Sequence, residues 1–187
     1  MSDDAIDTSA EVPTPEQSTE TRPMVTDDSL LADLLAGHPS VEVVVFAPSN
    51  GPPQDIALVP AADYHPFVAS VRDSGFDVFS DLCGVDYLRR RPRYEVVVNL
   101  LSHHLRRRIR IRAGVDGPDP VIASISDLYQ GANSFEREAY DMFGIRFTGH
   151  PDLTRILMPD DWEGHPLRKD YALGSVPVQF KGAHEAS

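Results

Sequence analysis

The chain has 187 residues, of which 41% are hydrophobic and 25% are charged, and its formal net charge is -12. These proportions exclude a fibrous or fully disordered chain, and the length favours one hydrophobic core of ordinary size. Cys83 is the only cysteine, which excludes an internal disulfide and an iron–sulfur cluster held by this chain alone, because such a cluster usually takes four thiolates.

The sequence also lacks the common signals for membrane insertion and cofactor binding. No apolar stretch approaches the roughly 20 residues of a membrane-spanning helix. The acidic N-terminus has no basic region followed by an apolar run, so we expect no secretory signal and a cytoplasmic location. Neither Gly-x-Gly-x-x-Gly nor a phosphate-loop pattern occurs. If the protein serves redox chemistry, we expect its cofactors to be bound by neighbouring subunits.

The charges are segregated along the chain. Residues 1–37 hold nine acidic residues and one basic residue, whereas residues 88–112 hold nine basic residues and one acidic residue. This basic belt, residues 88–112, can face nucleic acid, anionic lipid head groups, an acidic protein surface or solvent.

The N-terminal region predicts disorder followed by the start of a folded core. Residues 1–26 combine Asp, Glu, Ser, Thr and Pro with almost no large apolar side chain. They bury too little surface to offset the entropy of ordering them, so we expect a disordered acidic arm. An αβ core domain is predicted for residues 27–130. It begins with a short helix of leucines at helical spacing, which Gly37 ends.

Periodic patterns predict most of this core. β-branched residues predict strands over 41–46 and 55–59, joined by a turn. Apolar residues from Tyr64 to Val71 recur at positions i, i+3, i+4 and i+7, which predicts an amphipathic helix that Gly75 ends. Three further strands are predicted over residues 76–88, 94–101 and 105–112.

The last of these strands indicates what the basic belt does. Ile109 and Ile111 point to one face and the arginines between them to the other, as on a strand with one wet face. The aromatic residues expected of a nucleic-acid platform are missing, so we favour a belt that faces solvent or protein. His103 and His104 have no partner at a metal-ligand spacing, and no metal site is predicted there.

Residues 131–187 form a separate region. A compact helix is predicted from near Ser134 to Gly144. Beyond it the chain has four prolines and no regular periodicity, but it is too apolar to lie free in water. We therefore predict an α+β fold: a two-layer mixed β-sheet with helices on one face, followed by an extended C-terminal tail that lies on partner subunits. We expect the tail from Gly149 to Lys181 to be dispensable for folding of the core.

One group of motifs in this region is specific. The run FEREAYDMFGI at residues 135–145 is followed by GHPDL at 149–153, RILMP at 155–159 and DWEGHPLRKDY at 161–171. In order and spacing these runs resemble the signature of the C subunit of respiratory complex I. The N-terminal αβ part resembles that family in layout only.

The resemblance implies a structural subunit, without cofactors of its own, in the peripheral arm of a proton-translocating NADH:quinone oxidoreductase. Such a complex carries electrons from NADH through FMN and iron–sulfur clusters in other subunits to quinone. The chain would then act as part of an enzyme and be inactive alone. Its implied partners are chiefly the large D subunit, beside the quinone-reducing region, and also the B subunit. It would lie on the cytoplasmic side of the cell membrane, touching the membrane only through the complex and binding no nucleic acid.

The signature also contains carboxylates and imidazoles, which are common proton carriers and metal ligands. Neighbouring Arg and Lys residues would pair with these carboxylates, so we favour ion pairs at an interface over proton handling or a metal site. Trp162 and Tyr171 are interpreted as side chains that fill pockets of a partner. No catalytic, cofactor-binding or metal-ligating residue is assigned. The predicted interface residues are Glu136, Arg137, Glu138, Asp141, Arg155, Trp162, His165, Arg168, Asp170 and Tyr171.

Two alternatives remain open. The chain is also compatible with the equivalent subunit of a membrane-bound hydrogenase or a related dehydrogenase, which the neighbouring genes would distinguish. A different class is a free-standing anion- or nucleic-acid-binding module that uses the belt from Arg89 to Arg112, for which salt-dependent binding would be the sign. A hydrolase is weaker, because no nucleophile motif is found.

Overall fold

The computed structural model describes residues 21–23, 29–46 and 54–171. The elements in this part of the chain are β1 (Thr21–Pro23), α1 (Ser29–Gly37), β2 (Glu42–Phe46), β3 (Gln54–Pro60), a 3-10 turn (Ala61–Asp63), α2 (Tyr64–Asp73), β4 (Val78–Asp86), β5 (Tyr94–Ser102), β6 (Arg107–Val115), β7 (Val121–Ala123), α3 (Ala132–Phe143) and β8 (Arg146–Thr148).

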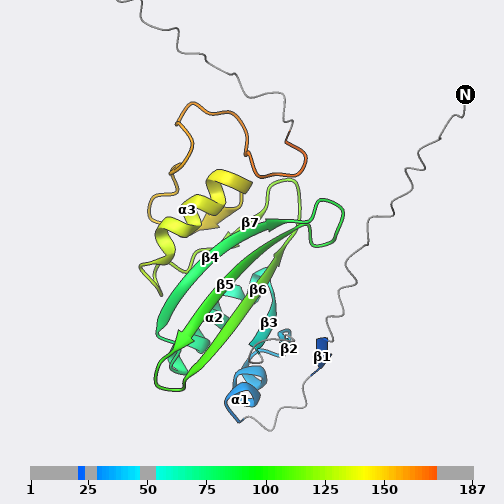
Figure 1. Cartoon of the computed structure of the whole chain (residues 1–187), viewed down its shortest axis with the longest axis vertical. Coiled ribbons are helices and arrows are strands. Elements are labelled where there is room, and N and C mark those ends of the chain that lie inside the picture. Colours follow the sequence, from blue (N-terminus) through cyan, green and yellow to red (C-terminus); the bar gives the residue numbers. More distant parts are fainter. Residues whose placement is uncertain (1–20, 24–28, 47–53, 172–187) are drawn as a thin grey trace, which may run out of the picture.

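Six strands form one mixed sheet in the order β1-β2-β3-β6-β5-β4. Strands β3 and β6 run parallel, and the other neighbours run antiparallel. Helix α2 lies behind β5 and β6, and no described helix covers the front of these strands in Figure 1. Strands β7 and β8 pair in parallel as a second, small sheet. The predicted α+β fold with a mixed sheet is confirmed.

The core lies between α2 and the sheet. The residues at positions i, i+3, i+4 and i+7 of α2 are all fully buried, from Tyr64 to Val71. They meet alternate residues of β5 and β6, including Val98 and Ile111, which are also fully buried. Burying each such apolar side chain contributes about 1.5–3 kcal/mol. The alternation also places Arg108, Arg110 and Arg112 on the opposite face of the sheet.

The structure differs from the predicted elements in short pieces. Residues 21–23 form β1 and pair with β2, although residues 1–26 are predicted to be disordered. Composition does not reveal this pairing, because the backbone makes the hydrogen bonds. Helix α3 begins at Ala132, two residues before the predicted start. Residues 1–20, the predicted turn at 50–53 and residues 172–187 lie outside the described residues.

Helix α3 lies against β4, and the chain after it runs over α3 in Figure 1. We call residues 149–171 the C-terminal segment. It has no regular secondary structure, as predicted, but it is bonded to α3 and to the sheet along its length. Among the helices that the structure describes, none is long and apolar enough to cross a bilayer.

Candidate partner interface

Asp141 on α3 organises the first half of the C-terminal segment. Its carboxylate is fully buried. One oxygen accepts the backbone N–H groups of Ile156, Leu157 and Met158 at 3.0, 2.8 and 2.8 Å. The other accepts Arg155 Nη1 at 2.6 Å. Burial opposes ionisation of Asp141, but these four donors outweigh it, so the pKa of Asp141 lies below its usual range.

Arg155 closes this segment into a loop. Besides Asp141, its guanidinium donates to the carbonyl oxygens of Trp162 at 2.8 Å and Gly164 at 3.0 Å. Arg137 on α3 supports the same loop by donating to the carbonyls of Thr154 and Arg155. A segment without periodicity is thus fixed by side chains that donate to its backbone oxygens.

The next residues cap the end of α3. The N–H of Leu167 donates to the Met142 carbonyl at 3.0 Å, and Arg168 Nε donates to the Phe143 carbonyl at 2.6 Å. These are carbonyls that a helix end leaves without an intrahelical partner. Gly144 ends the helix with a positive φ of 72°, and a Cβ there would collide with His165 and Arg168. Glycine therefore permits both the turn and this close approach.

His165 serves as a neutral donor in this cap. Its Nδ1 lies 3.0 Å from the Asp141 carbonyl oxygen, which can only accept. Burial lowers the pKa of His165, and the nearby Arg168 and Arg155 lower it further. The imidazole is therefore uncharged at neutral pH and binds the helix end by hydrogen bonding.

A second ion-pair cluster ties the end of the segment to the sheet. Arg93 donates through Nε and Nη2 to both oxygens of buried Asp86, at 2.9 and 2.8 Å. Asp86 also accepts the N–H of Lys169, and Arg93 bridges to Asp170. Burial raises the pKa of Asp86, but these donors, Arg93 first, hold that pKa at about 2. Asp86 and Arg93 are not among the residues predicted from the sequence, because they lie far from the signature along the chain.

Glu136 has a different environment. It is fully buried on α3, and its carboxylate accepts the Ser124 hydroxyl at 2.6 Å and the Ile125 N–H at 2.8 Å. No salt bridge to Glu136 is found in the described part of the chain. Burial raises its pKa to about 7, although both hydrogen bonds act in the opposite direction. Within the described residues Glu136 is therefore held by hydrogen bonds alone, and its predicted ion pair stays a prediction.

The predicted interface residues divide into two buried and eight exposed or half-buried residues. Four of the ten lie close together, mainly through contacts within the chain: Asp141, Arg155, Trp162 and His165. Glu136 and Asp141 have no exposed surface, so neither can touch a partner directly in this conformation. Asp141 pairs with Arg155 of the same chain, as expected of a neighbouring arginine, and the role of both carboxylates at an interface stays a prediction. The remaining members are exposed or half-buried: Arg137, Glu138, Arg155, Trp162, His165, Arg168, Asp170 and Tyr171.

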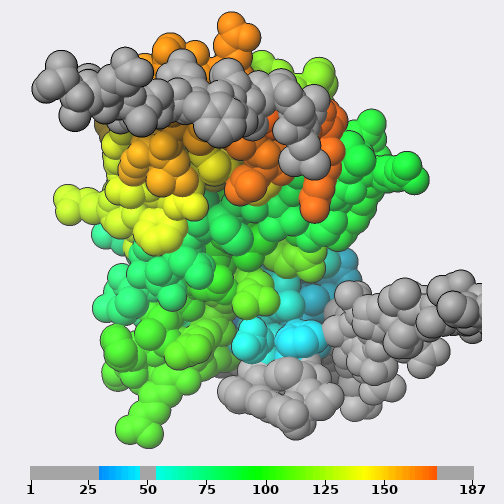
Figure 2. Space-filling model, turned by 45° about the horizontal axis from the view of Figure 1, so that its top comes forward, coloured from blue at the N-terminus to red at the C-terminus, as the bar shows by residue number. Residues whose placement is uncertain are grey.

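The C-terminal segment, predicted to lie on partner subunits, also packs on its own chain. Proline content and lost periodicity exclude a regular helix or strand, but they leave backbone donors and carbonyls free to meet buried side chains. Tyr171 contributes by donating to the Glu163 carbonyl at 3.4 Å. In Figure 2 the segment, in orange, lies over α3, in yellow.

The segment leaves three large apolar side chains exposed. Leu157 is 60% exposed, Leu167 52% and Ile156 40%. The backbones of Ile156 and Leu157 bind Asp141, so their side chains are held in place while facing outwards. Trp162 is half-buried, and its Nε1 has no hydrogen-bond partner among the described residues. Ile156, Leu157 and Leu167 are here called the apolar edge.

The described ranges contain no group of three or more His, Cys, Asp or Glu side chains placed to hold a metal ion. The carboxylates of Glu136, Asp141 and Asp170 instead accept hydrogen bonds from donors of the same chain. This arrangement can fix the shape of a surface, whereas acid–base chemistry would need an accessible titrating group.

Comparisons with known proteins agree with this description. The chain is 58% identical over 105 residues to the C subunit of the NADH-quinone oxidoreductase of Roseiflexus sp. (strain RS-1), and the match covers 56% of this chain and 60% of the relative. It is 57% identical over 109 residues to the same subunit of Salinispora arenicola, covering 58% and 44%. The chain thus matches about half the length of these relatives.

Two solved structures resemble the fold. A trypsin-resistant fragment of Nqo5 is 32% identical with a TM-score of 0.57, and the match covers 66% of this chain and 96% of the fragment. A chain of the membrane-bound sulfane sulfur reductase, an archaeal respiratory membrane complex, has a TM-score of 0.65 over 77% of this chain and 84% of its own. At 22% identity the second likeness concerns the fold alone.

The family model described as the respiratory-chain NADH dehydrogenase 30 Kd subunit matches residues 57–176. That match spans most of the sheet, α3 and the C-terminal segment, including Asp86, Arg93, Asp141 and Arg155. The chain therefore belongs to the 30 kDa subunit family of the respiratory-chain NADH dehydrogenase.

Proposed function

We propose that the chain is a structural subunit of the peripheral arm of a proton-translocating NADH:quinone oxidoreductase. In this proposal it holds no cofactor, and electrons pass from NADH through FMN and iron–sulfur clusters in other subunits to quinone. The chain contributes to an enzyme as a subunit and is inactive alone. The observation that carries the proposal is the apolar edge, held in place by the buried Asp141–Arg155 pair inside the family signature.

The apolar edge is the proposed docking surface, chiefly for the D subunit and also for the B subunit. Large apolar side chains in water favour burial at about 25 cal/mol per Å², and a clustered, rigid set is typical of an interface. Residues 27–130 form the supporting core, and residues 131–187 form the docking region. Half-buried Trp162 and Tyr171 belong to the same segment, and their exposed ring surface is proposed to add to this contact.

The proposed location follows from the complex. The subunit lies on the cytoplasmic side of the cell membrane and reaches the membrane only through its partners. The names of the curated relatives favour an NADH-quinone oxidoreductase over the equivalent subunit of a membrane-bound hydrogenase. The fold likeness to the sulfane sulfur reductase does not separate these two, since it concerns the fold alone.

Purification of the complex from its own membranes tests the proposal. An affinity-tagged chain, expressed in place of the native one, is expected to copurify with the NADH dehydrogenase subunits from detergent-solubilised membranes. Leu157→Asp with Leu167→Asp is expected to abolish copurification of the D subunit and to lower NADH:quinone activity in parallel, because two carboxylates would be buried at the interface.

The matched control is Leu88→Asp, which places a charge at another exposed leucine, 40% exposed and at a positive φ of 56° that Asp tolerates. It is expected to copurify normally. Absence of every NADH dehydrogenase subunit from the wild-type purification would overturn the proposed function. Normal assembly of the double variant would leave the function standing and place the interface elsewhere.

A further inference from the structure

One end of the uncovered sheet face carries an excess of cations. The turn between β5 and β6 exposes His103, His104 and Arg106, and Arg108 follows on the outer face of β6. Arg106 and Arg108 make no ion pair with any described residue. Arg107, in contrast, pairs with Asp55. We call Arg106, Arg108, His103 and His104 the basic turn.

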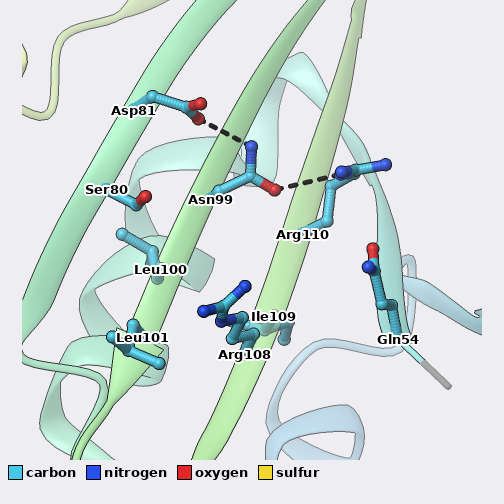
Figure 3. Close-up of a pocket in the computed structure, with 9 residues that line it drawn as sticks. All are labelled: Gln54, Ser80, Asp81, Asn99, Leu100, Leu101, Arg108, Ile109 and Arg110. Atoms are coloured by element: carbon cyan, nitrogen blue, oxygen red, sulfur yellow. Dashed lines mark hydrogen bonds between the residues drawn. The ribbon is translucent and has the colours of Figure 1, made fainter. Parts of the chain in front are cut away.

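The rest of the face satisfies its own charges. Arg110 donates to the Asn99 side chain at 3.0 Å, and Asn99 donates to Asp81 at 2.6 Å, a chain of bonds drawn in Figure 3. Arg112 pairs with Glu95 at 2.7 Å. The arginines of this face that bind no described side chain therefore lie at the turn, beside an open groove of about 580 Å³ that Gln54, Leu101 and Arg108 help to line.

Strand register places the N-terminal arm at this same end of the sheet. Thr21, the first residue of β1, lies opposite Phe46, which lies opposite Gln54. Gln54 lies next to Arg108, because β3 and β6 run parallel and the following residues, Asp55 and Ile109, are paired. Three strand spacings of roughly 4.8 Å separate Thr21 from Arg108, or about 15 Å. Residues 1–20 therefore join the sheet at the end that carries the basic turn.

Those residues have the complementary charge. Residues 1–20 contain six acidic residues and no Lys or Arg. A single extended residue advances at most about 3.6 Å, so five residues are enough to cover that distance. Glu16, five residues before Thr21, is therefore within reach of the turn, and the acids before Glu16 can follow the groove.

We propose that residues 1–20 of this chain lie along the groove, with Glu16 and the acids before it against Arg106 and Arg108. The arm neutralises the basic turn of its own chain and thereby keeps other polyanions off the open sheet face. Single exposed pairs contribute little, but several pairs joined to one tether act at a high effective concentration. The contact is electrostatic and is expected to weaken with salt.

Paramagnetic broadening in the full chain tests this contact. A nitroxide is attached through Ser9→Cys in a Cys83→Ser background, so that the label site is unique. Residue 9 is twelve residues from Thr21, far enough for the label to lie elsewhere if the arm does not dock. The amide signals of residues 102–108 are expected to lose most of their intensity, and those of α2, on the opposite face, to keep it.

Charge variants show whether the basic turn is responsible. Arg106→Gln with Arg108→Gln is expected to restore the signals of residues 102–108, as are Glu11→Gln with Glu16→Gln and about 1 M NaCl, where the Debye length is about 3 Å. The matched control, Arg89→Gln with Arg91→Gln, removes two exposed arginines at the other end of the sheet and is expected to change nothing.

Three results would overturn the proposal. The first is no selective broadening of the basic turn. The second is broadening that survives neutralisation of Arg106 and Arg108. The third is displacement of the arm by phosphatidylglycerol vesicles but not by phosphatidylcholine vesicles, which would make an anionic lipid surface the preferred occupant.

Discussion

Asp141 is the residue on which the proposed docking region depends, because one buried carboxylate accepts hydrogen bonds from three backbone donors and a guanidinium. Asp141 fixes the geometry of the loop that carries Ile156 and Leu157. Among the described residues, no other carboxylate accepts the backbone N–H groups of that loop. A buried pair costs desolvation energy to form, but removing one member leaves the other charge unpaired.

The first prediction concerns Asp141→Asn, which keeps the shape of the side chain and removes its charge. Arg155 would lose its ion pair, and the amide NH2 group would face donors. We expect the free energy of unfolding, measured by urea denaturation, to fall by about 3–5 kcal/mol. Asp119→Asn, which removes an exposed partner of Arg146, is the control and should have a much smaller effect. Equal losses in the two variants would contradict this assignment.

Glu136 supplies the second prediction, a dependence of stability on pH. Its pKa in the folded chain is about 7, above the ordinary value of 4.5. The folded state therefore binds the proton more tightly than the unfolded state, and its stability is fully present below pH 4.5. As pH rises from 4.5 towards 7, the free energy of unfolding falls by on the order of 3 kcal/mol. Above pH 7 the contribution of Glu136 no longer changes.

Glu136→Gln should remove this dependence, because an amide can still accept from Ile125 and hydrogen-bond to Ser124. We expect wild type and variant to be similar near pH 4.5 and the variant to be more stable at pH 8, as measured by urea denaturation across that range. Glu138→Gln, an exposed neighbour on the same helix, should leave the wild-type curve unchanged. A flat difference between wild type and Glu136→Gln would show that the carboxyl is already ionised at low pH.

At the scale of elements, regular periodicity is what made the fold predictable. Strands β5 and β6 and helix α2 each bury residues at the spacing read from the sequence, and the structure confirms them. Strands β1, β7 and β8 have three residues each, too few to show a period. Their pairing is set by tertiary contacts that local composition does not contain.

The candidate site was predictable in its location but not in its contacts. The signature marks α3 and the C-terminal segment, and Arg155 was expected to pair with a carboxylate nearby. Which carboxylate it meets, and that Glu136 meets no described cation, depends on how the chain crosses α3. Asp86 and Arg93 join the segment from the sheet, and no spacing in the sequence connects them to Asp170.

The third prediction tests the C-terminal segment as an element. A chain that ends at Asp152 would leave Asp141 without its donors and α3 without its cap. We expect its thermal midpoint to fall well below that of the full chain, or its cooperative transition to disappear. The control chain ends at Ala172 and keeps every contact described above, so its midpoint should be nearly unchanged. A normal transition in the shorter chain would support the original expectation that the core folds without its tail.

At the scale of the whole molecule, the exposed cations of the basic turn and the exposed side chains of the apolar edge lie in different places. The cations of the basic turn lie at the far end of β5 and β6 from the cluster of Asp86, Arg93 and Asp170, which joins the C-terminal segment to the sheet. The two proposed contacts therefore involve different physical forces. The arm would be held by charges in water, and the partner by apolar side chains on a frame of buried ion pairs.

The fourth prediction uses this difference. Salt screens exposed charges, with a Debye length near 10 Å at 0.1 M and 3 Å at 1 M, but it does not weaken the burial of apolar surface. Raising NaCl to about 1 M should release the arm from the basic turn while the tagged chain still copurifies with the D subunit. Low concentrations of urea, which solvate apolar groups, should release the D subunit first. If the D subunit instead dissociates at high salt in wild type and stays bound in urea, exposed ion pairs such as those of Glu138 or Lys169 carry the interface, and the apolar edge does not.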